Sequence, residues 1–371
     1  MSTGHASSPG PSLAEALADP GRLPALPLAA WDGLLRQARH ANLLGRLAVS
    51  LDALGRLEQV AAPVQPHLVS ALRLVTHQRQ GVGWECRHLE QALEPLGIPV
   101  VLLKGAAYAM SGRRAAEGRL FGDIDLLVPR EALPHTEAAL MLHGWRSGAS
   151  DPYDQRYYRQ WMHELPPMAH HRRCTIVDVH HNVLPLSSRH VPDACALLAA
   201  RVPLPGTIFS VLAPCDMVLH SAVHLFHEGE LRNGLRDLLD LQALLSEFSA
   251  GDPGFWGSLL ERASALGLGW PLALALRQLH ALPGLPIPAE VLEASARQSG
   301  LGAARLAALD ALYRRALHTA APATPPATAQ LARALVYLRA HALRMPPGRL
   351  ALHLGRKLVL RSVRHTSRVE P

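Results

Sequence analysis

The sequence predicts an α+β fold, in which a small mixed β-sheet core is flanked by helices and followed by an all-helical C-terminal region. Three observations predict it. Helical periodicity fills residues 12–95. Short β-branched and leucine-rich runs, which are typical of buried strands, gather in residues 96–184. Helical patterns return at Pro185 and continue toward the C-terminus. We therefore expect a sheet core between two helical regions.

The N-terminal helical region follows a polar tail rich in glycine, proline and serine. This tail, residues 1–11, is expected to be disordered because it offers little apolar surface to bury. Prolines mark the breaks between the helices of residues 12–95. The apolar positions from Leu68 to Leu93 predict one long helix that leads into the core.

The predicted core contains three strand-like runs. "IPVVLLKG" (98–105) ends in glycine, as a buried strand does where it turns into a helix. "DIDLLV" (123–128) predicts the second strand, and "CTIVDVHHNV" (174–183) predicts a further one. Between the last two, residues 131–143 predict an amphipathic helix, and the aromatic-rich stretch at 153–165 belongs to a region that favours strands.

The C-terminal part is divided by a proline-rich stretch. We predict a helical domain at 185–318, a linker at 319–330 and a basic helical segment at 331–371. Seven of the chain's basic residues and one acidic residue lie between Arg344 and the end, so most of the formal charge of +7 is there. A solvated end helix is the simplest interpretation of this tail, and contact with an anionic membrane surface is the alternative.

The rest of the chain is close to electrically neutral. This argues against a long nucleic acid as partner, because such a partner requires many phosphate contacts. Four scattered cysteines fit neither a metal motif nor a disulfide framework. The N-terminus has no signal-peptide pattern, and no apolar run approaches the roughly 20 residues of a membrane span. We therefore expect a cytoplasmic protein.

Two aspartates inside the second strand carry the main chemical signal. Side chains alternate along a strand, so Asp123 and Asp125 share one face. Their charges repel, and burying a carboxylate without a partner is costly. A hard divalent cation would satisfy both, because it prefers oxygen ligands. The alternative is structural: Asp123 would cap a turn and Asp125 would pair with an arginine.

The turn after the first strand offers a site for phosphate. Gly105 lies where backbone N–H groups can hold phosphate oxygens. Lys104 precedes it and is one of only two lysines among 37 basic residues. Its compact ammonium suits a cramped phosphate pocket. Arg119, four positions before Asp123, is a second cation that could reach the same face or the phosphates.

A third carboxylate lies on the later strand. Asp178 and His180 share one face of "TIVDVHHNV", and Asp178 would join the aspartate pair if the two strands are neighbours. His180 would then orient Asp178. Three carboxylates of this kind suit phosphoryl or nucleotidyl transfer, in which two metal ions hold the attacking and leaving oxygens and a carboxylate polarises the acceptor hydroxyl.

These motifs resemble a known family. "LLKGAAY", "RLFGDIDLLV" and "VDVHHNV" are similar to the bacterial uncharacterised nucleotidyltransferases of the polymerase-β-type superfamily. The resemblance covers about residues 85–245 and implies Mg²⁺ or Mn²⁺ and an NTP, with ATP the expected one. It implies that Asp123 and Asp125 hold the metals, that Asp178 completes the triad, and that the turn at Gly105 holds the triphosphate.

The chain departs from the wider superfamily at one position. Ala106 follows Gly105 where a serine is usual, so no hydroxyl reaches the phosphate there. A non-catalytic nucleotide- or partner-binding protein with the same fold therefore remains an alternative, as does a histidine-based zinc enzyme built on His220, His224 and His227.

The acceptor is expected to be a small molecule or a peptide. The helical region after Pro185 would supply its contacts, and the predicted acceptor pocket consists of His180, His220, His224 and Arg236.

Overall fold

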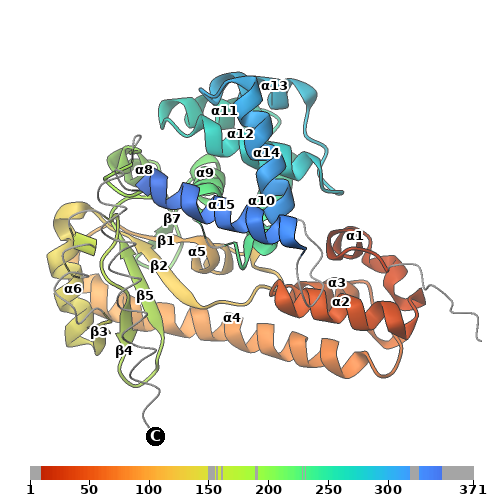
Figure 1. Cartoon of the computed structure of the whole chain (residues 1–371). Helices are drawn as coiled ribbons and strands as arrows, with labels where there is room; N and C mark the ends of the chain where they lie inside the picture. The colour runs from red at the N-terminus through yellow and green to blue at the C-terminus, as the bar shows by residue number, and fades with distance from the viewer. Residues whose placement is uncertain are drawn as a thin grey trace, which may run out of the picture.

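We describe the protein from a computed structural model, which covers residues 10–148, 155, 158–159, 162–188, 191–227, 229, 231–317 and 326–344. The predicted α+β fold is confirmed. Within these residues seven strands form one mixed sheet in the order β3-β4-β5-β2-β1-β7-β6, and helices surround it (Figure 1).

The sheet is built around β2, which lies between β1 and β5. The strands are β1 (Val100–Leu103), β2 (Asp123–Leu127), β3 (Trp145–Ser147), β4 (Met168–His170), β5 (Ile176–His180), β6 (Val202–Pro203) and β7 (Phe209–Val211). Strand β2 runs antiparallel to β1 and parallel to β5. All four side chains of β1, Val-Val-Leu-Leu, are buried, which is typical of a strand enclosed on both faces.

One long helix connects the N-terminal region to the sheet. The N-terminal helices are α1 (Leu13–Ala18), α2 (Leu28–His40), α3 (Leu44–Ala53) and α4 (Gln65–Leu93). The 29 residues of α4 span about 43 Å at about 1.5 Å per residue, which confirms the predicted long helix. It contacts α3 toward one end, and α5 (Lys104–Met110) and α6 (Leu133–Leu142) of the core toward the other (Figure 1).

The remaining helices lie in the core and the C-terminal region. They are α5 (Lys104–Met110), α6 (Leu133–Leu142), α8 (Ala194–Ala199), α9 (Pro214–His227), α10 (Gly234–Gly251), α11 (Phe255–Ala265), α12 (Gly269–His280), α13 (Ala289–Gln298), α14 (Ala303–Leu317) and α15 (Ala327–Arg344). Helices α11 to α14 gather at the top of the view in Figure 1, and α9 lies between them and the sheet. Helix α9 contacts α5, α10 and α12, so it connects the core to the C-terminal helices.

The prediction of a purely helical region from Pro185 onward is wrong at one point. Strands β6 and β7 lie inside it, and β7 pairs in parallel with β1. The predicted domain boundary at residue 184 therefore leaves out a strand of the central sheet. At three residues, β7 is too short to show an alternating pattern, and its conformation depends on the free edge of β1.

Two further expectations are corrected. Gln155, Tyr158 and Arg159, the described residues of the early part of the aromatic-rich stretch, are helical rather than extended. Helix α15 begins at Ala327, inside the predicted linker. Most of that linker, the tail beyond residue 344 and residues 1–9 lie outside the described residues. Across the described ranges, no helix combines the length and the apolar character that a membrane span requires.

Candidate active site

The structure brings the three predicted aspartates together on one side of the sheet. Asp123 and Asp125 lie on β2, and Asp178 lies on the neighbouring strand β5. The two strands are parallel, and Asp125 and Asp178 are direct partners in the register. Register partners on parallel strands point to the same face and are about 4.8 Å apart. The three carboxylates therefore converge, as the sequence predicted they would if the strands were neighbours.

Asp125 is the buried and fully neutralised member of the triad. Lys104 Nζ lies 3.1 Å and His180 Nε2 lies 3.0 Å from its Oδ1 atom. Burial alone would raise the pKa of Asp125, but the Lys104 charge and the His180 hydrogen bond outweigh it and hold the pKa well below the usual range. Lys104, which was expected at a phosphate, thus pairs with Asp125 in the metal-free site, and phosphate contact by Lys104 stays a prediction. His180 was expected to orient Asp178, but it contacts Asp125 instead.

Asp123 and Asp178 are short of positive charge. Burial and the charge on Asp125 raise the pKa of Asp178 from 3.8 to about 7. Loss of hydration and the same charge raise the pKa of Asp123. Asp178 Oδ1 is buried and has no hydrogen-bond partner in the part of the chain that the structure describes. A buried carboxylate oxygen without a partner, beside two more carboxylates, fits a divalent cation with oxygen ligands.

The turn between β1 and α5 has an unusual backbone. Lys104 adopts a left-handed conformation, with φ of 45°, which is costly for a residue other than glycine. This conformation lets the chain leave β1 and enter α5 within one residue. At Gly105 an added Cβ atom would lie 3.0 Å from Arg119 Nε and 3.1 Å from the Phe121 ring. A side chain here would crowd both groups, so packing favours glycine, as would any approach of a phosphate.

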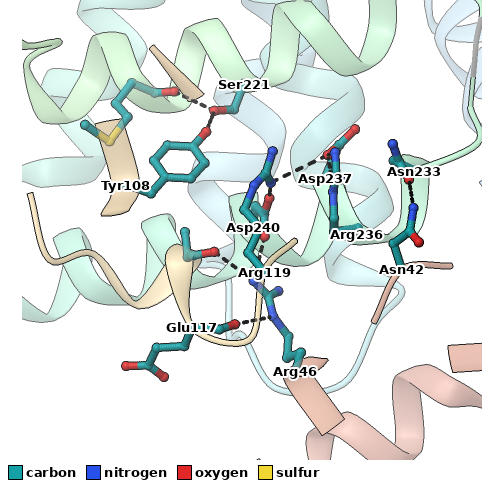
Figure 2. A network of polar contacts seen from close by, with 12 residues as sticks. Asn42, Arg46, Tyr108, Glu117, Arg119, Ser221, Asn233, Arg236, Asp237 and Asp240 are labelled. Carbon is teal, nitrogen blue, oxygen red and sulfur yellow. Dashed lines mark hydrogen bonds and ion pairs between the residues drawn. The ribbon is translucent and has the colours of Figure 1, made fainter. Parts of the chain in front are cut away.

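Arg119 lies in a buried ionic network that joins α3, the core and α10 (Figure 2). Its guanidinium pairs with Asp240 of α10 and lies 3.8 Å from Asp237 Oδ1. Arg46 of α3 donates to Asp240 Oδ1 at 2.6 Å. Burial lowers the pKa of both arginines to about 10, so both are charged at neutral pH. Arg119 was expected at the nucleotide phosphates. Here it neutralises Asp240, and phosphate contact by Arg119 stays a prediction.

Helix α9 lies close to the triad. Tyr108 of α5 and Ser221 of α9 share a hydrogen bond of 2.5 Å, which fixes α9 over the turn (Figure 2). His224 is close enough to lower the pKa of both Asp123 and Asp125. His220 is buried, and burial together with the Lys104 charge holds its pKa well below 6.5, so it is neutral.

Arg236, predicted for the acceptor pocket, and His227, part of the zinc site considered as an alternative, make contacts elsewhere. Arg236 donates to Asp237 Oδ1 at 2.8 Å and so belongs to the ionic network (Figure 2). His227 packs against the Trp270 ring, with ring centroids 4.7 Å apart. Within the described residues, the donor atoms of His220, His224 and His227 do not form a group that could hold one metal ion, so the zinc site considered as an alternative is not found.

Two residues beside the triad were missed by the sequence analysis. Glu164 Oε2 lies 3.3 Å from His180 Nδ1, on the side of the imidazole away from Asp125. His163 lies next to it, with its ring centroid 5.2 Å from that of His180. Glu164 also contributes to the raised pKa of Asp178. Their stretch, "MHEL", carries no motif, and only its pairing with β5 reveals them.

A pocket of about 720 Å³ opens where β2 and β5 begin. Asp123 lines it together with Gln78 and Trp84 of α4 and Arg173. Trp84 is 46% exposed, so its ring is available to a bound molecule. The pocket provides space for a substrate group next to the first aspartate.

The converging carboxylates beside a strand-to-helix turn are the arrangement that the resemblance to the nucleotidyltransferases implied. The chain belongs to the family of uncharacterised nucleotidyltransferases, whose family model matches residues 27–284. No curated protein and no solved structure matches the chain. Membership supports nucleotidyl transfer as the general chemistry and implies an NTP substrate.

Proposed function

We propose that the protein transfers a nucleoside monophosphate from an NTP, with ATP the expected donor, to a hydroxyl group of a small molecule or a peptide. Pyrophosphate would be released. The observation that carries this proposal is the convergence of Asp123, Asp125 and Asp178 on one face of two neighbouring parallel strands. Such a cluster has little structural benefit, because two of its members have pKa values raised by burial and mutual repulsion.

The three aspartates would hold Mg²⁺ or Mn²⁺. The fit is supported by the oxygen-only donor set and by the buried Asp178 Oδ1 atom, which lacks a hydrogen-bond partner among the described residues. When bound, the metal would supply charge neutralisation at the reacting phosphate and would lower the pKa of an attacking hydroxyl.

The remaining steps are assigned to the protein's own side chains. Asp178 would be a metal ligand through one carboxylate oxygen and would accept the proton of the acceptor hydroxyl through the other, because its carboxylate lies beside both Asp123 and Asp125. Lys104 would move from Asp125 to a phosphate oxygen once the metal neutralises that aspartate. The backbone at Gly105 would hold the triphosphate, and Arg119 would add positive charge behind the turn.

The acceptor would bind between α9 and the triad. His224 and the neutral His220 would contact it, because both lie near the aspartates. The charge on His224 acts to lower the pKa of Asp125, and the charge on Asp125 acts to raise the pKa of His220. A small molecule or peptide is favoured over a long nucleic acid because most of the formal charge of +7 lies in the C-terminal tail.

The test is to incubate the protein with labelled NTPs and a cell extract and to analyse by mass which component gains a nucleoside monophosphate. A labelled metabolite or peptide is the expected result. Labelled RNA or DNA, bound with a steep salt dependence, would contradict the acceptor class.

A second candidate is a non-catalytic nucleotide- or partner-binding protein with the same fold. Ala106 favours it, because this buried residue has no hydroxyl to offer a phosphate after Gly105. Calorimetry separates the two candidates: the second one binds NTP, or a protein partner, without releasing pyrophosphate over many acceptors.

A further inference from the structure

A second group of side chains of the types that bind metals lies beside the aspartate triad. The segment around Glu164 pairs antiparallel with the end of β5, where Leu165 N donates to Val179 O at 2.8 Å and His181 N donates to His163 O at 2.8 Å. This backbone pairing holds His163 and Glu164 next to His180. The three side chains are therefore positioned by sheet hydrogen bonds rather than by a free loop.

The donor atoms of these three residues are close together. One ring nitrogen each of His163 and His180 and one carboxylate oxygen of Glu164 all lie within 4.8 Å of one another. Ligands of a single zinc ion, at about 2.0–2.1 Å from it, can be at most about 4.2 Å apart. A side-chain movement of less than about 1 Å would bring the group to that geometry, and side-chain torsions allow this without moving the backbone.

The hydrogen bonding of His180 also suits a metal ligand. A neutral imidazole has a single N–H, and the Nε2 atom of His180 faces Asp125 Oδ1 at 3.0 Å. Nδ1 faces Glu164 Oε2 at 3.3 Å. Burial opposes the charged imidazole, but Asp125 and Glu164 outweigh it and raise the pKa of His180, so in the metal-free protein an imidazolium can donate one N–H to each carboxylate. A metal ion at Nδ1 would take the place of the proton that faces Glu164. Histidine ligands of metals commonly donate their other nitrogen to a carboxylate in this way.

We propose that His163, Glu164 and His180 form a second metal site, for a divalent transition-metal ion with Zn²⁺ as the preferred occupant. Two imidazoles and one carboxylate favour Zn²⁺ over Mg²⁺, which prefers oxygen ligands alone. The site is separate from the Asp123, Asp125 and Asp178 triad, although His180 touches Asp125. A bound ion would fix His180 and through it hold Asp125 in place, and the binding itself does not require the transfer reaction.

The test is calorimetric titration of Zn²⁺ into the full-length protein, stripped of metals with a chelator and kept free of nucleotide. We expect one tight site in the wild type. His163→Ala and the conservative Glu164→Gln should each weaken it at least tenfold. Two controls should keep it: His135→Ala, which removes an exposed histidine of α6, and Asp123→Asn, which alters only the triad.

Binding of Co²⁺, followed by its visible absorption, provides a second readout of histidine ligation, and circular dichroism checks that each variant is folded. Unchanged Zn²⁺ affinity in the folded His163→Ala and Glu164→Gln variants would overturn the proposal. So would the absence of a tight site in the wild type, or its loss in Asp123→Asn. The transfer assay does not enter the test, so this proposal and the proposed function can fail independently.

Discussion

Two aspartates that face each other across β2 and β5 should affect stability in opposite directions. Asp125 is neutralised by Lys104 and His180, whereas Asp178 is half-buried near other carboxylates. We therefore predict that Asp178→Asn stabilises the metal-free protein at pH 8 and that Asp125→Asn destabilises it. The two substitutions are matched, because each removes one negative charge at register partners of the same sheet.

The magnitude follows from the pKa of Asp178, which rises from 3.8 to about 7 on folding. Each pH unit corresponds to about 1.4 kcal/mol, so ionising Asp178 at pH 8 would cost the folded state up to about 4 kcal/mol. Relaxation of the side chains and penetration of water reduce such costs, because the effective dielectric near a protein surface is high. We expect Asp178→Asn to raise the free energy of unfolding by about 1–3 kcal/mol at pH 8.

The pH dependence of the free energy of unfolding tests the direction of both effects independently. Between about pH 4 and pH 7 the folded protein holds a proton on Asp178 that the unfolded chain has released. The free energy of unfolding of the wild type therefore falls as pH rises through this window. Asp178→Asn lacks this fall, so its advantage should be smaller at pH 5 than at pH 8. Asp125 behaves oppositely, because its pKa is lowered on folding: its contribution is present at neutral pH and is lost as pH falls.

The assay is urea denaturation at 25 °C of the wild type and both variants in chelator, at pH 5 and pH 8. A loss of stability in Asp178→Asn at pH 8, or a gain in Asp125→Asn, would refute the description of the site. Addition of Mg²⁺ should stabilise the wild type more than Asp178→Asn, because the variant lacks one of the proposed ligands.

Three further predictions concern the surroundings of the triad. Asp240→Ala leaves buried arginines without their carboxylate and should lower the free energy of unfolding in denaturant by about 3–5 kcal/mol. The control Asp32→Ala breaks an exposed ion pair within a helix and should lower it by less than about 1 kcal/mol. Equal losses would contradict the network. Gly105→Ala should lower both the free energy of unfolding and the affinity for NTP, because its Cβ atom would lie 3.0 Å from Arg119 Nε. Unchanged NTP binding in calorimetry would exclude the turn as the triphosphate site. Trp84→Ala should raise the KM of one substrate with little change in Tm, since the ring is 46% exposed at the pocket beside the triad; an unchanged KM for both substrates would separate this pocket from the reaction.

The sequence predicted the central strands because their own composition and alternation are enough to indicate a strand. The fully buried β1 and the alternation that places Asp123 and Asp125 on one face are local patterns. The position of Asp178 depended on one assumption, that its strand lies beside β2, and the register confirms it. The strands themselves need no long-range information, whereas the pairing of β2 with β5 does.

The features that were missed depend on contacts between distant segments. Arg119 and its partner Asp240 are separated by more than a hundred residues, so no local pattern could show that the guanidinium is already engaged. Glu164 joins the site only through its bridge to His180. Strand β7 exists because β1 offers it an edge. In each case the partner, rather than the segment's own composition, determines the structure.

The central claim is that the aspartate triad performs nucleotidyl transfer, and the most direct measurement is the rate of pyrophosphate release with NTP, Mg²⁺ and the acceptor identified from the extract. The double variant Asp123→Asn/Asp178→Asn is the informative comparison, because both carboxylates have raised pKa values and their removal should not destabilise the fold. We predict that this variant unfolds no more easily than the wild type and loses at least about a thousandfold in rate, on the order expected when metal-assisted transfer is removed. A folded double variant that releases pyrophosphate at the wild-type rate would contradict the account.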